Sequence, residues 1–285
     1  MITRELSKDE SFSLTNDGNL QLFFLGVGSA FASRHFQLNF LLVQGEHHIM
    51  VDFGMTGPAA LRQVARLQPT DIEVLLPTHS HADHVGGIEC LALMNRYVGM
   101  RQMNKRKLRM IIDENYQRVL WDYSLRGGLE WNEKDDRTAQ KLGFSDFFEV
   151  VRPTWKTMQP RETYEVQLGP THLEIFRTSH IPEQSRTWEA SFISYGMFVN
   201  GHVFISCDTK YDRPLIDQYA PMSSVMFHDV QFHSGSVHAP LSDLRSLSPA
   251  IKSKMHLMHY SDDWEQQDIA DFAGWAQQGL VYEFD

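Results

Sequence analysis

The sequence has little cysteine, no long apolar run and no basic excess. Only two cysteines occur in 285 residues, Cys90 and Cys207, which argues against a disulfide framework and favours a reducing compartment. No stretch approaches the ~18 consecutive apolar residues of a membrane span. The charged start MITRELSKDE also lacks the apolar core of a secretory signal. We therefore expect a cytoplasmic protein without a membrane partner.

The charge balance is acidic, with 36 Asp and Glu against 26 Lys and Arg, and a formal net charge of −10. Proteins that bind long nucleic acids usually present a basic footprint. The only dense basic run, RQMNKRKLR at 101–109, is interpreted as a solvated loop or helix end. We expect no long nucleic acid as a partner, whereas a small anionic substrate remains compatible with this charge.

Hydrophobic residues make up 42% of the chain, enough for a large α/β core. Short apolar runs predict strands at 20–25, 40–43, 48–53, 72–76, 164–168, 172–178, 190–199 and 202–206. Helical patterns cover 58–67, 87–97, 214–219, 241–247 and 264–278. Two blocks of strands, each followed by helices, predict a four-layer αββα sandwich. We expect a single domain over 1–285, with a less regular insertion at about 100–160 shaping one side of the site.

Three imidazoles and a carboxylate lie within six residues, directly after the strand predicted at 72–76. They are His79, His81, Asp83 and His84. Alternation along an extended turn would send His79, His81 and Asp83 one way and His84 another, so that one loop feeds two adjacent metal ions. A solvated histidine-rich turn is the other interpretation, but the strand before the run and the glycines after it favour a metal site.

Further candidate ligands follow other apolar runs. His180 follows the strand predicted at 172–178, Asp208 follows that at 202–206, and His259 follows the run before it in Leu257-Met258-His259. A catalytic zinc ion keeps one coordination position for water, so two ions need at least three ligands beyond the loop. These three residues are therefore candidates to complete the site.

The run His79-x-His81-x-Asp83-His84 resembles the H-x-H-x-D-H signature of the metallo-β-lactamase superfamily. The resemblance implies His79, His81 and His180 on one ion and Asp83, His84 and His259 on the other, with Asp208 bridging. Two Zn²⁺ are expected, with Mn²⁺ as the alternative. By simple count, two such ions, two carboxylates and a hydroxide leave a charge of about +1, which suits an anionic phosphodiester.

Segments outside the loop resemble the ribonuclease Z-like phosphodiesterase branch of this superfamily. Phe24–Ala30 resembles its LGTGSA opening, and His228–Phe232 resembles its H-E-A-T-F segment with Asp229 in place of Glu. Ser236–Ala239 lies where that branch carries an H-S-T loop. The resemblance implies His238 as general acid, oriented by Asp229, although the missing methylene leaves their direct contact open. The alternative role of His238 is to hydrogen-bond a loop.

The spacing between two candidate ligands distinguishes among substrates. Only 27 residues separate His180 from Asp208, whereas bacterial-type ribonuclease Z inserts a long glycine-rich arm there to grip tRNA. The pattern is most similar to the anti-Pycsar phosphodiesterases, which degrade cyclic-nucleotide immune signals. That resemblance implies hydrolysis of cCMP, cUMP and related 3′,5′-cyclic mononucleotides to 5′-monophosphates by a homodimer, with Asp83 orienting the attacking water. A tRNA 3′-processing endoribonuclease and a non-catalytic nucleotide-binding module stay open as alternatives.

Overall fold

The computed structural model describes residues 1–7, 9–133, 141–235 and 237–284. These residues form two compact units. The chain passes from one unit to the other after Leu25, Leu38, Pro153 and Gln278. Unit 1 comprises 1–25, 39–153 and 279–285, and unit 2 comprises 26–38 and 154–278. The prediction of one domain with an insertion at about 100–160 stays a prediction. Ser236, in the segment expected to carry the general acid, lies outside the described residues.

Unit 1 is built on an eight-stranded sheet of order β1-β16-β2-β3-β4-β5-β6-β7 among the described residues. The strands are β1 (Ile2–Glu5), β2 (Leu20–Gly26), β3 (Asn39–Gln44), β4 (His47–Val51), β5 (Val74–Leu76), β6 (Leu108–Ile111), β7 (Phe148–Val151) and β16 (Leu280–Phe284). β3 and β4 pair antiparallel, whereas β4, β5, β6 and β7 pair in parallel. The parallel half therefore places the carboxyl ends of its strands at one edge, where ligand-bearing loops gather in open α/β sheets.

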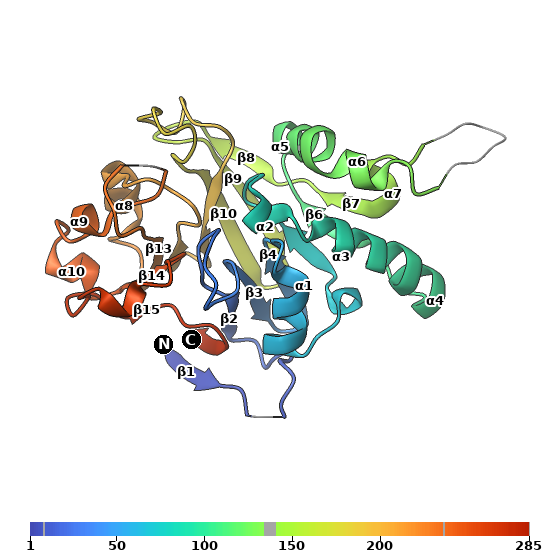
Figure 1. Cartoon of the computed structure of the whole chain (residues 1–285), viewed down its shortest axis with the longest axis horizontal. Helices are drawn as coiled ribbons and strands as arrows, with labels where there is room; N and C mark the ends of the chain where they lie inside the picture. Colours follow the sequence, from blue (N-terminus) through green and yellow to red (C-terminus); the bar gives the residue numbers. More distant parts are fainter. Residues whose placement is uncertain (8, 134–140, 236, 285) are drawn as a thin grey trace. The chain divides into compact units, whose positions relative to one another are not determined.

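The helical segments of unit 1 are short. They are α1 (Gly57–Ala60), η1 (Leu61–Ala65), η2 (Pro69–Asp71), α2 (Ala82–Val85), α3 (Ile88–Met94), η3 (Asn95–Met100), α4 (Arg101–Met103), α5 (Glu114–Leu120), η4 (Trp121–Leu125), α6 (Arg126–Leu129) and α7 (Phe144–Phe147). Figure 1 shows α3 and α4 as one continuous helical stretch through η3. Among the described residues, no helix is long and apolar enough to cross a membrane.

Unit 2 contains the second eight-stranded sheet, of order β15-β14-β13-β12-β11-β10-β9-β8 in the described part of the chain. Its strands are β8 (Thr154–Thr157), β9 (Thr163–Leu168), β10 (Thr171–Arg177), β11 (Tyr195–Val199), β12 (Val203–Ile205), β13 (Val225–Asp229), β14 (Met255–Met258) and β15 (Gly274–Trp275). The helical segments are α8 (Arg213–Tyr219), α9 (Leu241–Leu244), α10 (Pro249–Lys252) and η5 (Trp264–Gln266). β12, β13 and β14 run parallel, so their carboxyl ends also share one edge.

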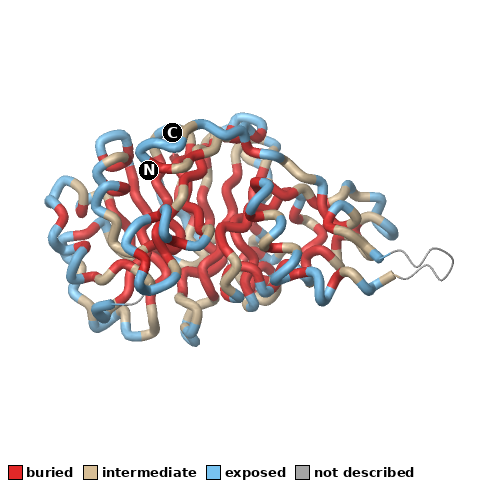
Figure 2. The backbone as a smooth tube through the Cα atoms, turned by 90° about the horizontal axis from the view of Figure 1, so that it is seen from above, coloured by how far each residue is buried: buried red, intermediate tan, exposed pale blue. Residues whose placement is uncertain are grey.

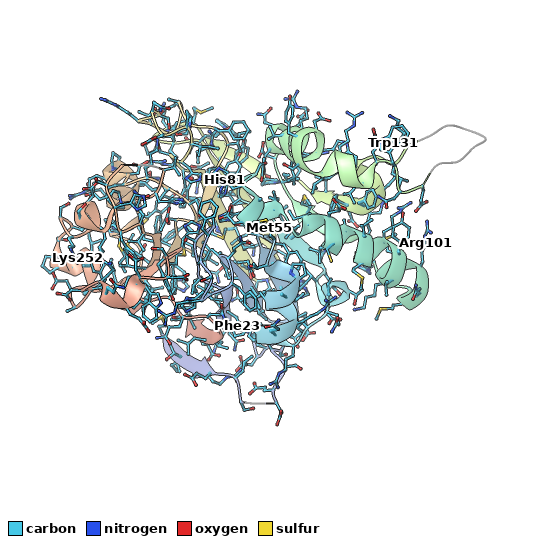
Figure 3. All side chains as sticks on the ribbon, viewed as in Figure 1. Phe23, Met55, His81, Arg101, Trp131 and Lys252 are labelled. Atoms are coloured by element: carbon cyan, nitrogen blue, oxygen red, sulfur yellow. The ribbon has the colours of Figure 1, made fainter. Side chains whose placement is uncertain are left out.

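Burial explains why many of the strands could be predicted from the sequence. β3, β4 and β11 contain no exposed residue, and Figure 2 shows long runs of consecutive buried positions along the backbone. Strands covered on both faces appear as continuous apolar runs rather than as alternating patterns. Phe23, labelled in Figure 3, is such a residue: it is fully buried in β2 and stacks on Phe12 with 4.2 Å between ring centroids.

Three sequence expectations need correction. The tract 100–160 is more regular than expected, because it supplies β6 and β7 to the first sheet and β8 to the second. The strand expected at 190–199 begins only at Tyr195, after a hydrogen-bonded loop. The prediction of a helix over 264–278 is wrong beyond η5, which ends at Gln266. Backbone amides of Ala273 and Ala276 there donate to Met255 and Leu257 of β14, so pairing at the sheet edge overrides the helical pattern.

A pH-dependent stability is expected from His48 of β4. Its Nε2 accepts a hydrogen bond from the Glu73 amide at 3.0 Å, and burial lowers the pKa of His48 from 6.5 to about 4. Between these values the folded state binds fewer protons than the unfolded chain, so the stability present above pH 6.5 decreases as the pH falls towards 4. Replacing His48 by Gln, whose amide oxygen can accept the same bond, should remove ~1–3 kcal/mol of that decrease.

Urea unfolding of the wild type and of His48→Gln at several pH values in this window measures the effect. Equal pH dependence of the two free energies of unfolding would contradict the assignment.

Candidate metal centre

The histidine-rich run of unit 1 follows the carboxyl end of β5. The rings of His79 and His81 lie 4.7 Å apart between centroids, and those of His79 and His84 lie 4.2 Å apart. His84 Nε2 is 3.3 Å from Asp83 Oδ2. The expectation of an extended turn through Asp83 is wrong, because α2 begins at Ala82 and carries Asp83 and His84 in one helical turn. His81, labelled in Figure 3, directly precedes that helix.

Asp52, at the carboxyl end of β4, fixes the geometry of this run. Its carboxylate accepts hydrogen bonds from the Thr78 amide at 2.7 Å and the Thr78 hydroxyl at 2.8 Å. The same carboxylate lies 2.7 Å from His84 Nδ1. A carboxylate on Nδ1 fixes the tautomer and leaves Nε2 of the ring for a metal ion. Burial raises the pKa of Asp52, while His84 and Thr78 act in the opposite direction.

Unit 2 brings its three predicted ligands together at strand ends. His180 follows β10, Asp208 follows β12 and His259 follows β14. Nε2 of His180 and Nε2 of His259 each lie 3.6 Å from Oδ2 of Asp208, and all three side chains are buried. A carboxylate placed between two imidazole nitrogens is suited to bridge two cations.

The backbone at these strand ends adopts a left-handed conformation that residues other than glycine rarely adopt. Asp52, Cys207 and His259 have φ values of 58°, 47° and 61°. A left-handed backbone at a residue other than glycine costs free energy and persists where the surroundings enforce it, which is often at functional sites. Each of these residues is a candidate site residue or immediately precedes one.

Asp229, the last residue of β13, holds both His238 and His259. Its Oδ2 lies 2.7 Å from His238 Nδ1 and accepts the Thr209 amide at 2.9 Å, while its Oδ1 lies 3.4 Å from His259 Nδ1. Burial alone would raise the pKa of Asp229, but the neighbouring imidazoles of His238 and His259 bring it below its ordinary value. The shorter side chain therefore does reach His238, which answers the question left open by the sequence.

The loop that carries His238 is also joined to a predicted ligand. His180 Nδ1 lies 2.8 Å from the carbonyl oxygen of Val237, so the ring is oriented by the residue next to His238. His228 is different: it is fully buried, and its Nδ1 hydrogen-bonds the Asp229 carbonyl at 2.8 Å. Burial lowers the pKa of His228, which is consistent with a neutral structural residue.

The donors present fit a divalent cation. The predicted ligands Asp208 and His259 belong to a cluster with Asp229 and His238 in which each residue places one donor atom within 4.8 Å of the others. Neutral imidazole nitrogens and carboxylate oxygens are the ligands that Zn²⁺ and related cations take. Asp52 was not assigned a role from the sequence, although Val51-Asp52-Phe53-Gly54 places an acidic residue at a strand end. That position was the available signal.

Comparison with solved structures identifies the fold. The metallo-β-lactamase fold protein YhfI from Bacillus subtilis matches with a TM-score of 0.67 at 13% identity, covering 93% of this chain and 100% of that one. The short form of human tRNase Z matches with a TM-score of 0.60 at 15% identity, covering 92% and 98%. The chain therefore has the metallo-β-lactamase fold, which confirms the fold class predicted from the sequence.

Within that class the family is also shown, because the family model of Anti-Pycsar protein Apyc1 matches residues 20–282. Anti-Pycsar protein Apyc1 of Paenibacillus sp. (strain J14) is 34% identical over 86% of this chain and 91% of the relative. That of Bacillus phage 010DV004 is 33% identical over 92% and 98%. The chain belongs to the Anti-Pycsar protein Apyc1 family. Together with the His and Asp clusters, this supports a metal-dependent hydrolase with a Pycsar-counteracting role.

Replacing Asp52 by Asn should weaken metal binding without unfolding the protein. The amide retains the shape of the carboxylate but not the charge that holds His84 Nδ1, and substitutions of this kind typically reduce metal affinity ~10–100-fold. Competition with a chromophoric chelator measures the affinity. Asp17→Asn, at an exposed position, is the control and should bind metal as the wild type does. Unchanged affinity in Asp52→Asn would contradict the role of Asp52.

Proposed function

We propose that this protein is a di-zinc phosphodiesterase that hydrolyses 3′,5′-cyclic mononucleotides such as cCMP and cUMP to nucleoside 5′-monophosphates, and thereby counteracts Pycsar signalling. In this proposal His79, His81 and His180 hold one ion, Asp83, His84 and His259 hold the other, and Asp208 bridges them. The proposal includes a homodimer acting on a small anionic nucleotide.

The observation that carries the proposal is the contact between Asp229 and His238. A 2.7 Å contact between Nδ1 of His238 and Asp229 Oδ2 orients the ring and leaves Nε2 as the nitrogen that can donate a proton. Cleavage of a phosphodiester expels an alkoxide, a poor leaving group unless it is protonated. The His238 side chain remains partly accessible, with 19% relative exposure, whereas Asp229 and Asp208 are fully buried. His238 is thus suited to protonate the departing 3′ oxygen.

The remaining site residues provide orientation and charge. Two bound zinc ions would lower the pKa of water and neutralise phosphate oxygens. In this proposal the Asp83 carboxylate accepts a hydrogen bond from the attacking water and thereby orients the water oxygen towards phosphorus. Asp52 holds the imidazole of His84 by its Nδ1 atom at 2.7 Å, and Asp229 lies 3.4 Å from Nδ1 of His259, so that little reorganisation is needed during the reaction.

The stretch between His180 and Asp208 favours a small substrate. It consists of a loop followed by β11 and β12, in place of the long arm with which ribonuclease Z grips tRNA. The net charge of −10 also disfavours a long polyanion. Membership of the Anti-Pycsar protein Apyc1 family supports cyclic-nucleotide substrates over tRNA.

Turnover on a panel of cyclic mononucleotides, cyclic dinucleotides and precursor tRNA tests the substrate class. We expect 5′-monophosphate from cCMP and cUMP, loss of turnover after chelation, and recovery on adding Zn²⁺. Recovery with Mn²⁺ alone would change the metal assignment. Cleavage of precursor tRNA without cyclic-nucleotide turnover would replace the proposal with tRNA 3′ processing. Binding of cyclic nucleotides without product would indicate a non-catalytic binding module.

Replacing His238 by Ala should retain both metal ions but slow turnover at least ~100-fold, because general acid catalysis typically contributes 10²–10⁴-fold. Metal content by mass spectrometry and kcat on a cyclic mononucleotide measure the two effects. The control is His233→Ala, an exposed histidine of the same loop, which should have wild-type kcat. A His238→Ala enzyme within a few-fold of wild type would refute the acid assignment.

A further inference from the structure

The loop between β10 and β11 has no regular secondary structure but is held by many hydrogen bonds (Figure 1, gold). Backbone hydrogen bonds close it at its base, from the Thr178 amide to the Ser194 carbonyl at 2.9 Å and from the Phe192 amide to the Ile181 carbonyl at 2.7 Å. Inside it, the Ser191 hydroxyl lies 2.9 Å from that of Ser185 and accordingly links its two halves. We call residues 181–194 the post-His180 loop.

Two cations from outside this loop hold it: the Arg177 guanidinium donates to the Ser191 carbonyl at 2.9 Å, and Lys210 binds the part nearest His180. Its ammonium donates to the carbonyl oxygens of Pro182 at 2.7 Å, Glu183 at 2.8 Å and Ser185 at 2.7 Å, and lies 3.1 Å from the Ser185 hydroxyl. An ammonium group has three N–H donors, so these acceptors occupy all of them. The Lys210 amide also donates to the Ser179 carbonyl at 2.6 Å. Lys210 therefore holds the chain immediately before and immediately after His180.

The full occupation of its donors decides between two roles for Lys210. A lysine two residues after a predicted metal ligand could instead bind a substrate phosphate, but that role needs free donors directed at the ligand. All three donors are used within the loop. The geometry is therefore that of a positioning residue, which acts on the substrate only through the residues it holds.

His180, which directly precedes the post-His180 loop, contacts the loop that carries the predicted general acid. The Nδ1 atom of its ring lies 2.8 Å from the Val237 carbonyl oxygen. Lys210 is therefore connected to the segment around His238 indirectly, through the backbone on either side of His180 and then through the His180 ring.

We propose that Lys210 is a positioning residue that fixes the post-His180 loop, and through it the orientation of His180 and His238. The inference rests on the proposed function in so far as His180 is a proposed metal ligand and His238 the proposed acid.

Lys210→Met removes the charge and keeps a similar unbranched side chain. We expect lost amide protection within 181–194 by hydrogen-exchange mass spectrometry, metal affinity reduced at least ~10-fold, and kcat reduced more than KM is changed. Lys210→Arg, which retains the donors, should recover part of each loss. The matched control is Lys254→Met, because the Lys254 ammonium also donates to two backbone carbonyls, those of Ala220 and Ser223.

The outcomes separate the alternatives. Lys254→Met should keep wild-type exchange in 181–194, metal affinity and kcat. Wild-type hydrogen exchange in 181–194 of folded Lys210→Met would overturn the proposal. An equal loss of amide protection in 181–194 of Lys254→Met would also overturn it, because that result would indicate general destabilisation. Exchange and metal affinity are measured without substrate, so a failure of the proposed cyclic-nucleotide activity leaves this test of Lys210 standing.

Discussion

Two buried carboxylates that hold imidazole Nδ1 atoms are the constraint on which this molecule depends. Asp52 holds His84 in unit 1, and Asp229 contacts both His238 and His259 in unit 2. An uncompensated carboxylate in such surroundings would be costly, so each is also given backbone amides, that of Thr78 or that of Thr209. The histidines therefore receive their orientation from groups outside the metal-binding run itself.

The sheets explain why these contacts are possible at all. In each unit the strands that end in site residues include a parallel set, and the polar side chains follow the carboxyl ends of that set. Left-handed backbone at Asp52, Cys207 and His259 turns the chain sharply at the last residue of a strand or just beyond it. A gentler exit would carry the next side chain away from the sheet edge. The local strain and the gathering of ligands are two aspects of the same turns.

Much of this arrangement was accessible from the sequence because it is local or covered on both faces. The ligand run 79–84 is contiguous, and buried strands such as β3 appear as apolar runs. The role of Lys210 was not accessible, because holding another residue leaves no local pattern, and the only sequence signal for Asp52 was its place at a strand end. The segment 264–278 failed for a related reason: its pairing with β14 is a tertiary contact that helical periodicity does not register.

The length of the side chain at position 229 is constrained by its surroundings. The carboxylate of Asp229 is surrounded at short range by His238 and the Thr209 amide, and the side chain is fully buried. An added methylene would drive the carboxylate into these partners, and a packed interior tolerates such insertion poorly. Position 229 is thus closed to glutamate while its neighbours keep their places. A glutamate there would require compensating changes at several neighbouring positions.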